Sequence, residues 1–163
     1  MSDPTHGDAG RLAARIGRLL DGRTIACAES CTAGLVAQTL AATEGSMEWF
    51  RGGVVAYQRG VKFALLGVTP GPVVTRGAAR EMAIGVRDLL DVDVAVSVTG
   101  AAGPEPLDGA EPGTIVVGVV AGDDDETFVH HLGGAPPDVC SGARTAALRD
   151  VVAVLEGAVA ASA

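Results

Sequence analysis

The stretch "VVAYQRGVK" at residues 54–62 contains two residue types that occur once each in the chain. Tyr57 is the single tyrosine and Lys62 the single lysine, whereas 11 of the 12 basic residues are arginine. A guanidinium is effectively never deprotonated in a protein, but a desolvated lysine amine can lose its proton. A lysine retained at this one position therefore favours a role as a proton acceptor.

The segment "AESCTAG" at residues 28–34 holds the candidate nucleophiles. Ser30 follows an apolar run that predicts a strand and opens a segment, 30–43, that predicts a helix. α/β proteins place ligands at such junctions, where the helix dipole favours a nucleophile. A helix cap by Ser30 or Thr32 is the commoner role of these residue types, so both readings stay open.

Cys31 is a rival nucleophile, although a small buried hydrophobe is the commoner role of such a cysteine. A cysteine nucleophile usually needs a histidine, and the candidates are His130 and His131. Because adjacent strand residues point to opposite faces, a Cys–His pair is not favoured. Glu29 can act as a general base or orient one, or it can be an exposed or capping carboxylate.

The stretch "TGAAGP" at residues 99–104 follows a second buried strand. Small residues let the backbone approach a ligand closely, and successive N–H groups there can form an anion nest or an oxyanion hole.

Hydrophobic periodicity predicts the elements that position these residues. Helices are expected at "AGRLAARIGRLLDGR" with Leu12, Ile16, Leu19 and Leu20 inward, at 30–43, at "GVKFALLGV", at 75–91 with Met82, Val86, Leu89 and Leu90 inward, and at "DVCSGARTAALRDVVAVLEGAVA". Strands are expected at 24–28, "VVAYQ", 92–100, "GTIVVGVVAG" and "ETFVHHLGG", the last two joined by "DDD" as a hairpin. This order predicts a three-layer α/β/α sandwich with a mixed, mainly parallel sheet of about five strands.

Composition narrows the functional classes. The net charge of -8 argues against a nucleic-acid partner, and no apolar run is long enough to span a membrane. The three cysteines lack zinc-ligand spacing, so a metal site is not expected, and a reducing cytoplasm is the natural location. The N-terminus has no signal-peptide pattern. Residues 1–8 are expected to be a flexible tail and 9–163 a single domain.

Four segments, "TIACAESCTAGLVAQTL", "GSMEWFRGGVVAYQRGVKFALLGV", "REMAIGVR" and "VSVTGAAGP", together resemble the C-terminal domain of the CinA (competence/damage-inducible) family. The likeness runs from about Arg11 to Leu155. Active members of that family are nicotinamide-nucleotide amidases, which hydrolyse nicotinamide mononucleotide to nicotinate mononucleotide and ammonia without a cofactor.

The resemblance implies catalytic roles for three residues of this chain: Ser30 as nucleophile, Lys62 as base, and Tyr57 to relay the proton or hold the amine. The segments around the junctions imply substrate-binding positions at Glu29, Cys31, Thr32, Gly34, Thr99, Gly100, Ala101, Ala102 and Gly103. A pyridine-nucleotide substrate, a homodimer and the three-layer fold are implied as well.

The chain departs from the family pattern where basic residues are usual. Glu111 stands at a lysine position, and Pro136 and Cys140 stand at arginine positions. A charge reversal beside a phosphate-bearing substrate weakens binding, although Arg144 or Arg149 can compensate from the same helix. Two alternatives to the amidase therefore stay open: a catalytically weak paralogue that acts as a binding domain, and an amidase for a different small amide.

Overall fold

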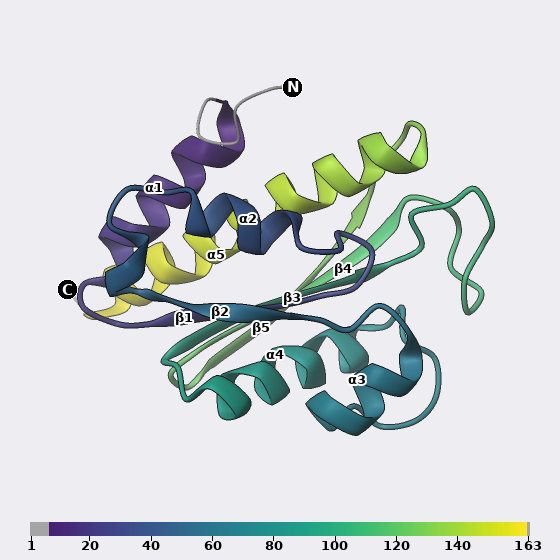
Figure 1. Cartoon of the computed structure of the whole chain (residues 1–163), viewed down its shortest axis with the longest axis horizontal. Helices are drawn as coiled ribbons and strands as arrows, with labels where there is room; N and C mark the ends of the chain where they lie inside the picture. Colours follow the sequence, from purple (N-terminus) through teal and green to yellow (C-terminus); the bar gives the residue numbers. More distant parts are fainter. Residues whose placement is uncertain (1–6, 163) are drawn as a thin grey trace.

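The computed structural model describes residues 7–162, which form helices and the strands of one sheet (Figure 1). The helices are α1 (Asp8–Leu20), α2 (Leu35–Ala41), α3 (Arg59–Leu66), α4 (Arg76–Leu90) and α5 (Pro136–Ser162), with a short 3-10 helix at Ser46–Glu48. The strands are β1 (Ile25–Glu29), β2 (Phe50–Val55), β3 (Val94–Gly100), β4 (Thr114–Ala121) and β5 (Asp124–His131). The predicted tail falls mostly on residues 1–6, outside the described residues.

The strands form one sheet in the order β2-β1-β3-β4-β5. β1 runs parallel to both β2 and β3, whereas β3–β4 and β4–β5 are antiparallel. The prediction of a mixed five-strand sheet is confirmed for the described residues, but the sheet is not mainly parallel, because two pairings are parallel and two are antiparallel. The predicted hairpin is present as β4–β5, and it turns at Gly122, whose φ of 63° suits glycine.

Helices cover both faces of the sheet, so the predicted three layers are present. α1, α2 and α5 lie on one face, and α3 and α4 lie on the other (Figure 1). The side chains between these layers are almost all aliphatic, as the low aromatic content predicts. The central strands β1 and β3 are buried along their whole length, as expected for strands with helices on both sides.

Two of the predicted inward faces need comment. On α1, Ile16 and Leu20 are fully buried, as predicted. On α4, Met82 and Val86 are buried, but Leu89 is 47% exposed because it lies in the last turn of the helix.

The helix predicted over 30–43 begins only at Leu35. Ala33 has a φ of 48° and Gly34 a φ of 105°, and neither value is compatible with a right-handed helix. Residues 31–34 therefore form a separate turn, and neither Ser30 nor Thr32 caps α2. The second strand also ends earlier than predicted, at Val55, which leaves Tyr57 in the connection to α3.

Candidate active site

Ser30 is the first residue after β1, in the middle of the sheet. Its N–H donates to the carbonyl oxygen of Val98 on β3 at 2.9 Å, which continues the parallel ladder by one residue. The carbonyl oxygen of Ser30 accepts from the N–H of Ala33 at 3.0 Å and closes the turn. The hydroxyl, held between strand and turn, faces the carboxyl edge of the sheet, where ligands bind in open α/β sheets.

Lys62 lies on α3 and reaches the same point from the other side. Its side chain is 1% exposed, and Nζ donates to Ser30 Oγ at 2.9 Å. Nζ also donates to the carbonyl oxygens of Ala56 at 2.7 Å and Tyr57 at 3.0 Å. The structure therefore brings together the serine and the lysine whose types suggested chemistry, although they are 32 residues apart in the sequence.

The environment of Lys62 lowers the pKa of its amine below the usual 10.5. Burial is the main cause, because a charged ammonium loses hydration there. The positive charge of Arg59 lowers the pKa further, whereas Cys31 and Asp108 raise it. The amine is therefore easier to deprotonate than an exposed lysine.

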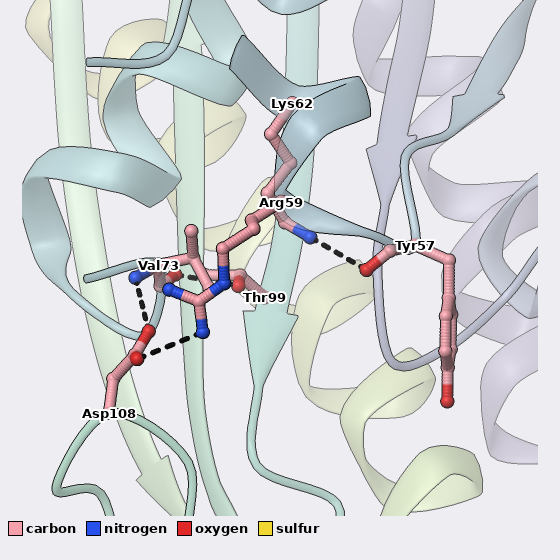
Figure 2. Close-up of polar contacts among 6 residues, drawn as sticks. All are labelled: Tyr57, Arg59, Lys62, Val73, Thr99 and Asp108. Atoms are coloured by element: carbon pink, nitrogen blue, oxygen red, sulfur yellow. Dashed lines mark hydrogen bonds and ion pairs between the residues drawn. The ribbon is translucent and has the colours of Figure 1, made fainter. Parts of the chain in front are cut away.

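Tyr57 contributes its backbone to this site. Its carbonyl oxygen accepts from Lys62, and it also lies 3.4 Å from Ser30 Oγ, which can donate to it. The side chain is 66% exposed and extends away from the amine (Figure 2). The carbonyl is thus the part of Tyr57 that contacts the amine, and the hydroxyl is not placed to relay a proton to Lys62.

Glu29 is buried and has a structural role. Its two carboxylate oxygens accept from the N–H groups of Val36 and Ala37, both at 2.9 Å. These are free donors of the first turn of α2, so the carboxylate caps the helix and fastens it to β1. Of the open readings, a capping carboxylate is the one that the structure supports, because both oxygens are occupied away from Ser30.

Cys31 lines the site, but its chemistry is unfavourable for a nucleophile. Burial, and secondarily the nearby Cys140, raise the pKa of its thiol to about 12, so the thiol is protonated at neutral pH. Cys140 Sγ donates to the carbonyl oxygen of Cys31 at 3.1 Å. No histidine of the described residues assists Cys31: His130 contacts Asp150 at 2.7 Å, and His131 is exposed.

A groove with two hollows surrounds the serine. One hollow, of about 340 Å³, is lined by Cys31 and by residues 100–107. The other, of about 300 Å³, is lined by Gln58, Arg59, Lys62 and Val73. Ser30, Tyr57 and Leu107 border both, so the serine lies where the two hollows meet.

The predicted binding positions divide into two groups. Those that line the groove are Cys31, Gly100, Ala101, Ala102 and Gly103. Those that do not line it are Glu29, Thr32, Gly34 and Thr99. Thr99 Oγ1 donates to the carbonyl oxygen of Val73 at 2.8 Å, and Gly34 precedes the first residue of α2. Thr32 is buried, and its hydroxyl has no hydrogen-bond partner among the described residues.

Backbone N–H groups at the groove can stabilise an oxyanion. Among the described residues, the N–H groups of Cys31, Ala102 and Gly103 have no backbone acceptor, whereas that of Ala101 donates to Thr114 O at 2.9 Å. Such donors, in two segments that line the hollow beside Ser30, suit the charge that develops on a carbonyl oxygen under attack.

The positions that depart from the family pattern lie outside the groove. Glu111 is exposed, Pro136 begins α5 and Cys140 lies in its second turn. Of the two arginines expected to compensate, Arg149 pairs with Asp8 at 3.0 Å and Arg144 has a buried Nε without a partner in the described residues. Neither lines the groove.

Asp108 connects two walls of the groove through a contact that was not predicted from the sequence. Asp108 Oδ1 accepts from Arg59 Nη2 at 3.0 Å, and its Oδ2 accepts from the N–H of Val73 at 2.7 Å (Figure 2). The spacing of Arg59 and Lys62 by three residues on one helix was a signal that both face the same side. Nothing in the sequence marks Asp108 as their partner.

Residues 7–162 contain no group of three or more His, Cys, Asp or Glu side chains placed to hold a metal ion. Within the same range no helix is long and apolar enough to cross a membrane.

The chain is a three-layer α/β sandwich in which a buried lysine hydrogen-bonds to a serine at the carboxyl edge of the sheet. These features define the class of the protein as an α/β protein with a candidate serine–lysine site. The CinA C-terminal domain matches residues 10–155, and the chain belongs to this family.

Relatives of known name agree. A CinA-like protein of Mycobacterium avium is 48% identical over 102 residues, which are 60% of this chain and 24% of that protein. A CinA-like protein of Trichormus variabilis is 40% identical over 131 residues, 75% of this chain and 32% of that protein. The chain thus spans about a third or less of the length of these relatives.

Solved structures share the fold over nearly their full length. A competence or damage-inducible protein from Enterobacter asburiae has a TM-score of 0.87 and 29% identity, covering 92% of this chain and 99% of that one. A competence/damage inducible protein from Agrobacterium tumefaciens has a TM-score of 0.87 and 29% identity, covering 96% and 99%.

Proposed function

We propose that the chain is an amidohydrolase that uses Ser30 as nucleophile and Lys62 as base. The observation that carries the proposal is the set of three contacts around Lys62 Nζ. A neutral amine has two hydrogens and one lone pair. When the carbonyl oxygens of Ala56 and Tyr57 accept the two hydrogens, the lone pair is left directed at the hydroxyl of Ser30.

The first half of the reaction forms an ester on the serine. Lys62 takes the proton of Ser30 as Oγ bonds to the amide carbon, and the carbonyl oxygen becomes an oxyanion near the free N–H groups of Cys31 and Gly103. The C–N bond then breaks, and the protonated Lys62 gives its proton to the leaving nitrogen, which departs as ammonia.

The second half releases the acid. Water gives a proton to Lys62 and bonds to the ester carbon, the bond between that carbon and Oγ breaks, and Ser30 recovers its proton from Lys62. Each proton returns to its starting place, so the protein is unchanged after one turnover.

The proposed substrate is nicotinamide mononucleotide, because the chain resembles amidases that act on it. A hollow of about 340 Å³ beside Ser30 has room for a small aromatic amide. The same resemblance supports a homodimer that acts in the cytoplasm on a pyridine nucleotide.

The test is ammonia release from nicotinamide mononucleotide by the purified protein and its variants. Ser30→Ala and Lys62→Arg are expected to lower kcat by about 10²–10⁴-fold or more, since a nucleophile and a general base each contribute that much. Ser141→Ala, which changes an exposed serine on α5, is the matched control and is expected to keep full activity.

Two outcomes contradict the proposal. Activity that survives Ser30→Ala would assign the nucleophile to another group, with Cys31 the first to examine. A wild-type protein that releases no ammonia from nicotinamide mononucleotide or other small amides would favour the binding-domain alternative.

A further inference from the structure

Arg59 is the first residue of α3 and stands three positions before Lys62, so both side chains lie on one side of the helix. It lines the hollow of about 300 Å³, and its side chain is 47% exposed. The other basic side chain of the groove, Lys62, is buried and occupied by three hydrogen bonds. Arg59 is therefore the one accessible cation among the described residues that line the groove.

The guanidinium of Arg59 is held in place. One nitrogen, Nη2, donates to Asp108 Oδ1, and Asp108 is itself fixed by the N–H of Val73 (Figure 2). The Asp108 side chain is 14% exposed, which limits its movement. A guanidinium has five N–H donors, so this single bond leaves an edge of the fork available to an incoming anion.

The two hollows differ in charge. The hollow of about 340 Å³ contains Glu105 and no basic side chain. The hollow of about 300 Å³ contains Arg59 and Lys62 and no acidic side chain among its lining residues. An anionic group is therefore disfavoured in the first hollow, whereas in the second it can bind at the guanidinium edge of Arg59 that Asp108 leaves free.

We infer that Arg59 binds the phosphate monoester of the substrate in the hollow between α3 and Val73, and so sets the preference for a phosphorylated amide. The inference rests on the proposed function for the identity of the substrate. With the phosphate beside Arg59 and the amide carbon at Ser30, the uncharged ribose occupies the border that both hollows share.

The first measurement compares nicotinamide mononucleotide with nicotinamide riboside, which differs by the phosphate alone. The wild type is expected to favour the nucleotide by about 10–100-fold in kcat/KM, the usual size of a charge-assisted contact. Arg59→Ala is expected to reduce this preference to about threefold or less, mainly through KM. Arg59→Lys is expected to restore part of it, because the charge returns without the planar fork.

The matched control is Arg80→Ala. Arg80 pairs with Asp125 away from the groove, so the preference is expected to stay at the wild-type value. A preference that is the same in Arg59→Ala as in the wild type would overturn the inference while leaving the amidase intact.

The second measurement does not need turnover. Calorimetric titration with ribose 5-phosphate and with ribose is expected to show binding of the phosphate compound alone, and Arg59→Ala is expected to weaken it about 10-fold or more. If the wild type releases no ammonia, this titration still decides about Arg59. Equal binding of ribose 5-phosphate by the wild type and Arg59→Ala, or no binding by either, would overturn the inference.

Discussion

The parallel half of the sheet, β2-β1-β3, and the antiparallel half, β4-β5, are both covered by helices, but they contribute differently to the site. Each parallel strand ends at the same edge, and the residues that follow supply Ser30, the Tyr57–Lys62 segment and the 101–107 loop. The hairpin makes its turn at the opposite edge and gives the groove no lining residue among those described. Parallel strands thus bring three distant segments to one place, whereas a hairpin mainly extends and braces the sheet.

The largest expected difference in stability is between substitutions of two glutamates, one in each half of the sheet. Glu29→Ala removes the acceptor of two N–H groups of α2, and we expect the free energy of unfolding to fall by about 2–4 kcal/mol. Glu29→Gln keeps one oxygen and is expected to lose about half as much. Glu126→Ala, at an exposed position of β5, is expected to change stability by about 0.5 kcal/mol or less. Urea denaturation measures all three, and equal losses would show that Glu29 does not cap α2.

A smaller difference is expected between substitutions of two buried glycines, Gly100 and Gly118. A Cβ at Gly100 would lie 2.7 Å from Thr114 O, and one at Gly118 would lie 2.6 Å from Ala79 O. Gly100→Ala and Gly118→Ala are therefore each expected to lower stability by about 1–3 kcal/mol. Only Gly100→Ala is expected to lower kcat/KM by about 10-fold as well, because the loop beside Ser30 starts there.

Thermal unfolding and ammonia release, measured on both variants, give the comparison. A Gly118→Ala protein that folds but loses as much activity as Gly100→Ala would show that the hairpin half also shapes the groove.

The smallest effect is a shift in pH dependence. Lys62 cannot accept a proton once it is protonated, so kcat/KM is expected to fall as the pH drops through the lowered pKa of this amine. The titratable groups around it are Cys31, Arg59 and Asp108. Arg59→Ala removes a positive neighbour, which raises the pKa and is expected to move the acid limb to higher pH by about 0.5 unit.

The control for this shift is Asp150 on α5, which contacts the antiparallel half of the sheet. Asp150 contacts His130 of β5, and burial raises the pKa of its carboxyl. Asp150→Asn is expected to leave the acid limb within about 0.2 unit of the wild type, because the charge lost is remote from Lys62. Profiles of kcat/KM for nicotinamide riboside, which lacks the phosphate, measure both shifts. Equal shifts in the two variants would show that the limb does not report Lys62.

The sequence predicted the layers well because hydrophobic periodicity depends on local spacing. It also singled out Ser30 and Lys62, since a lone lysine in an arginine-rich chain is a signal of chemistry rather than of charge. The contact between Ser30 and Lys62 depends on how β1 and α3 lie relative to each other in the fold. Only the resemblance to a known family implied this contact.

Other features of the site were not predictable from residue patterns. The turn at 31–34 was missed because "CTAG" is compatible with a helix, and only the left-handed conformations of Ala33 and Gly34 separate it from α2. The Tyr57 carbonyl was missed because a backbone group leaves no trace in residue type. Asp108 reaches Arg59 across a loop of small residues and prolines whose path has no periodicity to read.

Because the one lysine is buried, its chemical reactivity also reports how often the site opens. Amine-reactive reagents acylate exposed lysines at many sites in most proteins, which blurs the signal. Here the ε-amine of Lys62 is buried and hydrogen-bonded to Ser30, so its acylation requires that α3 or the turn at Ser30 move aside. The rate of labelling at Lys62 would therefore follow the local opening of the site without any engineered probe.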